Sequence, residues 1–303
     1  MRFAKIYVEI TDVCNLRCSF CPPTGRPPLY MCEADFELYL SRLAPFGDHL
    51  YLHVKGEPLL HPSLGDLLAI AARHGFAASV TTNGTLLEEK AGVLLGAANI
   101  RKLGISLHSH SGAADVDEYW RGVASFLELH RAVRPFPVSL RLWNRRAGVL
   151  PPETKRLWTL LRQRYPAAGE WASAADGARA IKLDEKVFAN QADLFAWPEL
   201  DFPQGAEARG RETNRPSGLR GFCLALRNQV AVLVDGRVVP CCLDGEGAMA
   251  LGNLRDMELG DILGSVRARA IYDGFSRRTL VEELCRSCGY RRRFDSPEDT
   301  PQT

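Results

Sequence analysis

The sequence lacks both a secretory signal and a membrane-spanning run. Its first residues, MRFAKIYVEITDV, do not follow the charged and then apolar pattern of a signal peptide, and no apolar run reaches the roughly 18 residues that a span needs. An excess of one charge is also missing, because 38 Lys and Arg residues face 36 Asp and Glu residues. The net charge of +2 gives no general attraction to nucleic acid or to anionic lipid. We therefore expect a cytoplasmic protein without a membrane partner, and a nucleic-acid partner is not favoured.

Cysteine is absent from the long segment between Cys32 and Cys223, although the chain has nine cysteines. Disulfides do not explain them in a cytoplasmic protein, because reducing compartments keep thiols free. Cysteines that only fill a core would not gather near both ends of a sequence. One group lies at positions 14, 18 and 21, and another at 223, 241, 242, 285 and 288. The two groups predict thiolate chemistry in two places.

Short apolar runs alternate with helical patterns along the first two thirds of the chain. Strands are expected at Lys5–Ile10, His49–Val54, Ala77–Thr82, Lys102–Leu107, Val138–Leu142 and Ile181–Phe188. Helices are expected at Asp35–Leu43, Leu64–His74, Leu86–Leu95, Val116–Arg131 and Thr154–Arg164. This alternation predicts an α/β fold with a parallel sheet, and its length suits a partial (β/α)6 TIM-like barrel. The ligand site should lie at the C-terminal ends of the strands.

The pattern loosens beyond the last of these strands. Residues 166–180 and 203–220 are rich in Gly, Ala, Pro and charged residues, which is typical of linkers and surface loops. Asp235 and Gly236 then join two alternating runs, which predicts a hairpin. A helix is expected over Asp261–Phe275. We therefore expect a small second unit in the last third of the chain.

Three thiolates within the segment TDVCNLRCSFC, from Thr11 to Cys21, can hold one metal centre. Zinc would need a fourth protein ligand, usually from a second CxxC pair, and none is near in the sequence. A [4Fe-4S] cluster can be held by three cysteines, which leaves one iron open for another molecule. We therefore expect Cys14, Cys18 and Cys21 to hold such a cluster.

Cys14, Cys18, Phe20 and Cys21 resemble the Cx3CxφC signature of the radical S-adenosylmethionine (SAM) superfamily. The segment KGEP after the second expected strand resembles the GGEP motif of that superfamily, with Lys55 in place of its first glycine. The segments TTNGT and ISLHS follow the third and fourth strands, where relatives contact SAM. The resemblance implies SAM contacts at Phe20, Gly56, Glu57, Pro58, Asn83, Ser106 and Arg141. Among these, Phe20 would contact the adenine, Glu57 the amino group and Arg141 the carboxylate.

The resemblance also implies an enzyme. In this superfamily an electron from the cluster cleaves bound SAM, and the resulting 5′-deoxyadenosyl radical takes a hydrogen atom from a substrate. A reductant such as flavodoxin or ferredoxin would supply the electron. The alternative is a non-enzymatic iron-sulfur electron carrier or scaffold. KGEP and TTNGT argue against it, because a carrier has no need of SAM contacts.

The second group of cysteines resembles the SPASM and twitch extensions of some radical SAM enzymes. Cys223, Gly236 and Cys241 match the opening Cx9-15Gx4C, and CRSC supplies Cys285 and Cys288. This resemblance implies an auxiliary [4Fe-4S] cluster on Cys223, Cys241, Cys285 and Cys288. It divides the chain into a radical SAM barrel at residues 1–200 and a SPASM/twitch-like region at residues 201–303.

Alternatives remain at this second group. A structural zinc would also suit four thiolates, and Cys242 stands next to Cys241 as another ligand. Full SPASM modules carry further cysteines, whereas CRSC is followed by GYRRRF, so a second auxiliary cluster is not expected. The cysteines left over, Cys32 and Cys242, are expected to be small buried residues, with hydrogen-atom donation to a substrate radical as the alternative.

The sequence allows two interpretations of the substrate class. SPASM relatives act on peptide or protein side chains, which is the leading reading, although no leader-binding domain is expected before the first strand. An RNA nucleoside or a small biosynthetic metabolite is the alternative. Arginine clusters at positions 141, 145 and 146 and at 286 and 291–293 would suit an anionic substrate, or simply form solvated surface. His108, at the end of the fourth strand, is a candidate to face the substrate.

Overall fold

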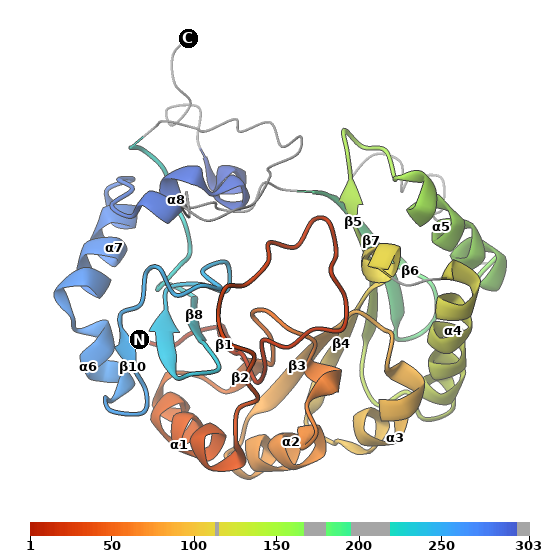
Figure 1. Ribbon diagram of the computed structural model, residues 1–303, viewed down its shortest axis with the longest axis horizontal. Helices are drawn as coiled ribbons and strands as arrows, with labels where there is room; N and C mark the ends of the chain where they lie inside the picture. Colours follow the sequence, from red (N-terminus) through yellow and green to blue (C-terminus); the bar gives the residue numbers. More distant parts are fainter. Residues whose placement is uncertain (113–114, 167–179, 195–218, 296–303) are drawn as a thin grey trace.

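The computed structural model describes residues 1–112, 115–166, 180–194 and 219–295. Within them, one sheet has the strand order β10-β9-β8-β1-β2-β3-β4-β5-β7-β6. Its parallel part is formed by β8 (Gln229–Val232), β1 (Lys5–Val8), β2 (His49–Tyr51), β3 (Ala77–Thr82), β4 (Ile100–Ser106), β5 (Val138–Arg145) and β7 (Val187–Asp193). Figure 1 shows that the sheet is curved and open, with helices along its outer rim. The predicted α/β fold with a partial barrel is confirmed.

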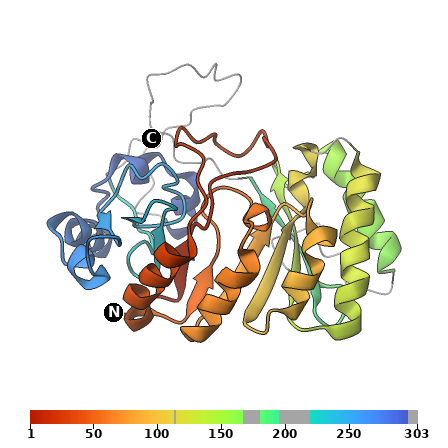
Figure 2. The ribbon, with the colours of Figure 1, turned by 60° about the horizontal axis from the view of Figure 1, so that its bottom comes forward.

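Helices cross over between the parallel strands and cover the convex face of the sheet (Figures 1 and 2). They are α1 (Glu33–Leu43), α2 (Leu64–Arg73), α3 (Leu87–Gly96), α4 (Val116–Val133) and α5 (Pro152–Arg164), with 3-10 turns at Ala44–Phe46, Pro58–Leu60 and Leu107–Gly112. All five helices were predicted, with ends that differ by a few residues. In the described part of the chain, no helix is long and apolar enough to cross a membrane.

The predicted role of Cys32 as a buried residue is wrong. Cys32 is exposed and stands at the N-cap of α1, where its sulfur accepts a hydrogen bond from the backbone N–H of Asp35 at 3.4 Å. A capping side chain must reach the free N–H groups of the first helical turn, which places it at the surface rather than in the core.

The sixth predicted strand, Ile181–Phe188, is wrong as a single strand. The segment forms an antiparallel hairpin in which β6 (Ile181–Lys182) pairs with β7, and β7 continues to Asp193 as the parallel neighbour of β5. The turn is formed by polar residues, and the carboxylate of Asp184 accepts a hydrogen bond from the N–H of Glu185 at 2.7 Å. Such side-chain bonds to the local backbone favour turns over extended strands.

The C-terminal unit continues the same sheet, because β8 pairs in parallel with β1. The predicted hairpin is present between β8 and β9 (Arg237–Val239), and β10 (Gly252–Asn253) extends it. Gly236 has φ +88°, and a Cβ atom there would lie 2.4 Å from the side chains of Asn253 and Tyr39, so the turn needs glycine. The boundary expected at residue 200, and nearly all of the loops expected at 166–180 and 203–220, lie outside the described residues.

The single helix predicted over Asp261–Phe275 is wrong, because two helices occupy the segment. The first, α6 (Leu259–Leu263), ends at Gly264, and the second, α7 (Val266–Ser276), begins after Ser265. The hydroxyl oxygen of Ser265 accepts a hydrogen bond from the N–H of Ala268 at 3.3 Å, so it caps the second helix. The described chain then continues through α8 (Glu283–Ser287) and a 3-10 turn at Gly289–Phe294.

The core lies between the convex face and the helices. Side chains of successive strand residues point to opposite faces, so Ile6 and Val8 of β1 are buried in this core while Tyr7 between them faces the concave side. On β5, Leu140 and Leu142 are likewise buried under the helices, and Arg141 between them keeps partial exposure. The concave face therefore carries the Arg141 side chain as well as a small cluster of buried apolar residues around Tyr7.

Candidate functional site

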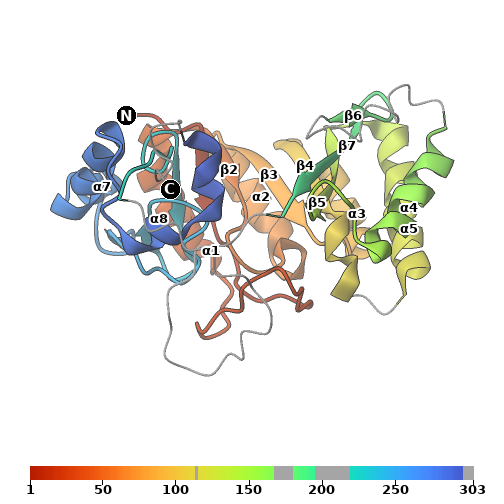
Figure 3. The same cartoon turned by 90° about the horizontal axis from the view of Figure 1, so that it is seen from above.

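The first cysteine group lies on the loop between β1 and α1, which projects beyond the C-terminal ends of the strands (Figures 2 and 3). The loop is closed at its base, because Thr11 pairs with Tyr30 and its hydroxyl group donates to the carbonyl of Leu29 at 2.8 Å. Its three thiols lie within electrostatic range of one another. Burial, with smaller contributions from Cys21 and Cys14, raises the pKa of Cys18 to about 11.

A buried ion pair fastens this loop to β1. Both guanidinium Nη atoms of Arg26 donate to the carboxylate of Glu9 at 2.7 Å. Glu9 is fully buried and also accepts hydrogen bonds from the N–H groups of Lys55 at 2.9 Å and Val234 at 3.0 Å. One carboxylate thus joins the cysteine loop, the KGEP segment and the turn after β8. Sequence reasoning missed this residue, although a glutamate within the apolar run YVEI was a signal of a buried, paired charge.

Lys55, which departs from the GGEP pattern, also holds the cysteine loop. Its ammonium group donates to the carbonyl of Pro22 at 2.6 Å, one residue after Cys21. The residue is 8% exposed, and its side chain packs over Gly245, where an added Cβ would lie 2.7 Å from Cε of Lys55. The lysine therefore occupies space that is left free by a glycine of the C-terminal unit.

The remainder of KGEP packs against the start of the cysteine loop. Gly56 has φ +70°, and a Cβ there would lie 2.3 Å from the carbonyl oxygen of Thr11. Glu57 is 2% exposed, and its two carboxylate oxygens accept hydrogen bonds from the N–H groups of Leu59 at 3.0 Å and Asn83 at 2.6 Å. Burial raises the pKa of Glu57 to about 7. The carboxylate is therefore held in place by backbone groups from the loops after β2 and β3, and Pro58 follows it as the first residue of a buried 3-10 turn.

Asn83 connects the end of β3 to the cysteine loop. Its amide nitrogen donates to the Asn15 side chain at 2.9 Å and lies 3.9 Å from the sulfur of Cys14. Its amide oxygen accepts from both the N–H and the hydroxyl group of Thr85, and the hydroxyl of Thr85 accepts in turn from Asn15 at 2.9 Å. The predicted residues Asn83 and Cys14 are thus brought together.

The end of β4 meets the other side of the loop. The rings of Phe20 and His108 lie with their centroids 4.9 Å apart, and the sulfur of Cys18 lies 3.7 Å from the carbonyl oxygen of Ser109. Burial lowers the pKa of His108 to about 4, and its Nδ1 lies 3.1 Å from the carbonyl oxygen of Arg141. His108, expected as a substrate contact, therefore lies as a neutral ring under Phe20.

Ser106, the last residue of β4, is in register with Arg141, the fourth of the eight residues of β5. The Arg141 guanidinium lies over the ring of Trp143 at 4.6 Å and against Gly104, where a Cβ would lie 2.7 Å from Cζ. Of the predicted SAM contacts, Phe20 belongs to the cysteine loop, and Gly56, Glu57 and Asn83 contact it, whereas the Arg141 side chain lies beside Gly104 and Trp143.

The second cysteine group comes together from three segments, before β8, after β9 and at α8. The pKa of Cys241 is well above its ordinary value. Burial is the main cause, and the neighbouring thiols also raise it, in the order Cys242, Cys223, Cys285 and Cys288. Cys223, Cys241 and Cys288 are each 9% exposed, and the sulfur of Cys285 lies 3.8 Å from that of Met249. All four predicted ligands are therefore neighbours.

Cys242 has different surroundings from Cys241. It packs with Tyr7, Val54 and Leu233 on the concave face, and the hydroxyl group of Tyr7 hydrogen-bonds to its sulfur. Cys242 is coupled to Cys223 as well, but only Cys241 is coupled to all of Cys223, Cys285 and Cys288. Among the described residues, no group of three or more His, Cys, Asp or Glu side chains is arranged around a point where a single metal ion would bind.

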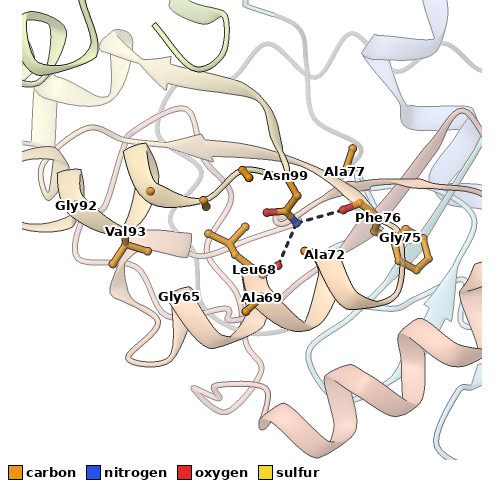
Figure 4. Close-up of a pocket in the computed structure, with 13 residues that line it drawn as sticks. Gly65, Leu68, Ala69, Ala72, Gly75, Phe76, Ala77, Gly92, Val93 and Asn99 are labelled. Atoms are coloured by element: carbon orange, nitrogen blue, oxygen red, sulfur yellow. Dashed lines mark hydrogen bonds between the residues drawn. The ribbon is translucent and has the colours of Figure 1, made fainter. Parts of the chain in front are cut away.

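A cavity of about 630 Å³ lies elsewhere, on the outer surface between α2 and α3 (Figure 4). Its walls are mainly small and apolar, and Asn99 in it donates to the carbonyl oxygens of Leu68 at 3.0 Å and Phe76 at 3.2 Å. The cavity is bordered by the starts of β3 and β4, at the end of the sheet opposite the cysteine loop. It is a gap in helix packing and takes no part in the candidate site.

Comparison with known families agrees with this geometry. Residues 8–134 match the radical SAM superfamily, and residues 223–289 match the iron-sulfur cluster-binding domain called SPASM. The chain belongs to the radical SAM enzymes and carries a SPASM domain. The two matched segments contain both cysteine groups, so the family assignment that the sequence motifs predicted is confirmed.

Curated relatives match only part of the chain. A GTP 3′,8-cyclase of Synechococcus sp. (strain CC9902) is 35% identical over 112 residues, which are 35% of this chain and 32% of that protein. A tungsten-containing aldehyde ferredoxin oxidoreductase cofactor-modifying protein of Pyrococcus furiosus is 33% identical over 96 residues, which are 28% of this chain and 25% of that protein. The chain thus spans about a third or less of the length of these two relatives.

Solved structures resemble the whole chain. BtrN in complex with AdoMet and 2-DOIA has a TM-score of 0.57 at 19% identity, covering 95% of this chain and 93% of that one. Native anSMEcpe with bound AdoMet and the Cp18Cys peptide has a TM-score of 0.59 at 14% identity, covering 99% of this chain and 91% of that one. At such identities the likeness concerns the fold alone.

Proposed function

We propose that this protein reductively cleaves SAM and uses the 5′-deoxyadenosyl radical to remove a hydrogen atom from a substrate. Cys14, Cys18 and Cys21 would hold a three-cysteine [4Fe-4S] cluster, which when bound supplies the electron that cleaves SAM. The donor set fits, because the three thiols share one loop at the C-terminal ends of the strands and lie within electrostatic range of one another. A reductant such as flavodoxin or ferredoxin would deliver the electron.

The observation that carries this proposal is the convergence of three strand ends on the cysteine loop. Glu57 after β2, Asn83 after β3 and His108 after β4 each contact that loop or the backbone beside it. We propose that Glu57 and the backbone of Gly56 and Pro58 receive the SAM amino group, that Asn83 and Ser106 position its methionyl and ribose parts, and that Phe20 contacts its adenine. His108 would then orient Phe20 through their ring contact.

At the second site, we propose that Cys223, Cys241, Cys285 and Cys288 hold an auxiliary [4Fe-4S] cluster. Cys241 is preferred to Cys242 because its thiol is electrostatically coupled to Cys223, Cys285 and Cys288, whereas Cys242 is coupled only to Cys223 among these and contacts Tyr7. Four thiolates leave no iron open, so the site would serve electron transfer or the ordering of the C-terminal unit rather than direct binding of a substrate.

A peptide or protein side chain is the substrate that we propose first, as the resemblance to SPASM enzymes implies. A small metabolite or an RNA nucleoside is the second candidate. Two observations favour it. The relatives include proteins named as GTP 3′,8-cyclases, and Nε of Arg141 on the concave face has no hydrogen-bond partner among the described residues.

Formation of 5′-deoxyadenosine tests the activity. The anaerobically reconstituted protein should contain about eight iron atoms, four at each site, and should form 5′-deoxyadenosine from SAM with dithionite. Replacing Cys14, Cys18 and Cys21 by Ala should remove about half of this iron and abolish the product, and Cys32→Ser, which keeps a capping oxygen on α1, is the matched control. Continued SAM cleavage by the triple variant would refute the proposal.

A further inference from the structure

Lys55 brings a positive charge to the first cysteine group. Its ammonium group donates to the carbonyl oxygen of Pro22 at 2.6 Å, and the sulfur of Cys21 lies 3.8 Å from that same oxygen. The cation and a predicted cluster ligand therefore share one backbone carbonyl. The first glycine of the GGEP pattern, which Lys55 replaces, would place no charge there.

The surroundings hold the Lys55 side chain in one position and keep it charged. Its stem runs across Gly245, where an added Cβ would lie 2.9 Å from Cγ and 2.7 Å from Cε of the lysine. Burial lowers the pKa of Lys55, and the nearby groups of Cys21, Glu246 and Glu9 oppose that effect. Negative groups and a carbonyl acceptor around an ammonium group favour its charged form.

Glu246 brings the opposite charge to the same loop. One of its carboxylate oxygens accepts a hydrogen bond from the N–H of Gly25 at 3.2 Å, and the other is buried without a hydrogen-bond partner among the described residues. The backbone carbonyl of Glu246 accepts from the guanidinium of Arg237 at 3.1 Å, which fixes the turn. Two charges of opposite sign, Lys55 and Glu246, therefore lie beside the segment that follows Cys21.

Fixed charges at this place act on the reduction potential of a cluster held by the first cysteine group. Reduction transfers one electron from the external reductant and no proton, so the centre with its three thiolates gains one negative charge. A fixed cation nearby stabilises the reduced form and raises the reduction potential, whereas a fixed anion lowers it. The effect is larger for buried groups, because water and salt screen them less.

We propose that Lys55 raises the reduction potential of the three-cysteine cluster and that Glu246 lowers it. The inference rests on the proposed function, because it requires that cluster. It gives Lys55 a role apart from SAM binding, in the electron transfer that precedes SAM cleavage. A cluster of higher potential accepts an electron from a weaker reductant, so Lys55 extends the set of electron donors that this protein can use.

A redox titration of the full-length, anaerobically reconstituted protein, followed by EPR without SAM, tests the inference. The signal of the first cluster is the one that changes when SAM is added afterwards. Lys55→Gln keeps a hydrogen-bond donor but removes the charge, so at a fixed solution potential the ratio of reduced to oxidised cluster should fall about tenfold, which is ~59 mV for one electron. Glu246→Gln should raise that ratio by a similar factor. Because SAM is absent, loss of a SAM contact cannot cause either shift.

Lys186→Gln is the matched control. The ammonium group of Lys186 donates to the carbonyl oxygen of Arg134 at 2.6 Å, which is the same kind of bond, but the residue directly precedes β7 at the end of the sheet opposite the cysteine loop. Its potential should equal that of the wild type. The double variant Lys55→Gln with Glu246→Gln should return toward the wild-type potential, because the two charges offset each other. Iron analysis before each titration verifies that the compared proteins carry the same iron content.

Either of two results would overturn the inference. One is an unchanged potential in Lys55→Gln. The other is a shift of the same sign in Lys55→Gln and Glu246→Gln, which would report a distorted loop rather than the effect of charge. Both differ from a failure of the proposed function, in which the wild type with its clusters loaded would form no 5′-deoxyadenosine while the shifts in potential were still measured.

Discussion

The amide nitrogen of Asn83 lies 2.9 Å from the side-chain oxygen of Asn15 and 3.9 Å from the sulfur of Cys14. A residue that follows β3 thus contacts the loop that follows β1, across the intervening β2. The contact is stabilised by Thr85, which bonds to both asparagines. The SAM-contact motif and the cysteine motif are therefore one structural unit. A variant of either motif should be assayed both for SAM binding and for iron content.

Asn83→Ala should weaken SAM binding at least tenfold, about 1.4 kcal/mol, while both clusters stay in place. The reason is that the asparagine would touch SAM and contact the cysteine loop without ligating iron. Titration of SAM against the reduced cluster by EPR, together with iron analysis, measures both effects. Asn99→Ala, in the outer cavity, is the matched control. Normal SAM-dependent spectra in Asn83→Ala would give Asn83 a purely structural role.

Lys55→Gly, which restores the GGEP pattern, should make the first cluster more labile. The substitution removes the bond from the ammonium group to the Pro22 carbonyl, which as a charge-assisted bond contributes about 1.5–3 kcal/mol. The rate at which a chelator removes iron should rise by about tenfold or more, whereas Lys90→Ala on the surface of α3 should leave it unchanged. Equal rates in both variants would mean that the Glu9 and Arg26 pair alone holds the loop.

Arg26→Met should lower the free energy of unfolding by about 3–5 kcal/mol, because it leaves the buried carboxylate of Glu9 without its cation. The control is Arg2→Met. Its ion pair with Asp48 joins side chains that are 68% and 73% exposed, so its loss should cost less than about 1 kcal/mol. Urea denaturation of the two variants measures the difference, and similar small losses would contradict the importance given to Glu9.

Cys241→Ser should remove about half of the iron, and Cys242→Ser should retain all of it. Cys241 is coupled to the three other cysteines of its site, whereas Cys242 bonds to Tyr7. Metal analysis after anaerobic purification gives both the count and the element. The reverse result would exchange the two ligands, and zinc in place of iron would remove the redox role of this site. Cys288→Ala should behave as Cys241→Ser does and leave uncoupled SAM cleavage intact.

Glu57→Gln tests the ionisation of the buried carboxylate. Burial raises the pKa of Glu57 from 4.5 to about 7, so the folded protein holds this proton more tightly than the unfolded chain. The stability that depends on Glu57 therefore falls as the pH rises from 4.5 to about 7. Gln does not ionise, so the unfolding free energy of the wild type relative to the variant should fall by on the order of 3 kcal/mol across that window.

Urea denaturation of both proteins at about pH 5 and about pH 8 measures this difference, and groups other than Glu57 cancel in the comparison. If the difference were the same at the two pH values, Glu57 would be ionised in the folded protein throughout. Its bonds from the N–H groups of Leu59 and Asn83 would then outweigh its burial.

The sequence predicted those features that depend on local patterns. The periodicity of apolar residues located β3 and all five crossover helices, and cysteine spacing located both thiol groups. Contacts between distant segments were not predictable in this way. The bonds from Glu9 to Arg26 and to Val234 depend on how β1 pairs with β8, and the bend of the Arg141 side chain toward Gly104 depends on the register of β4 and β5. The prediction of one strand over Ile181–Phe188 overlooked the three consecutive polar residues Asp184, Glu185 and Lys186, which indicate a turn.

The parallel pairing of β1 with β8 also affects the order of folding. During synthesis β1 emerges first, but one of its two neighbours in the sheet becomes available only after residue 229 has been made. Until then β1 has an unpaired edge beside the first cysteine loop, and such edges promote association with other chains. A pairing of such high sequence separation also slows folding. Loss of the C-terminal unit would therefore leave the strand that leads into the cysteine loop with a permanently open edge, so a truncated chain should aggregate rather than survive as a smaller, one-cluster protein.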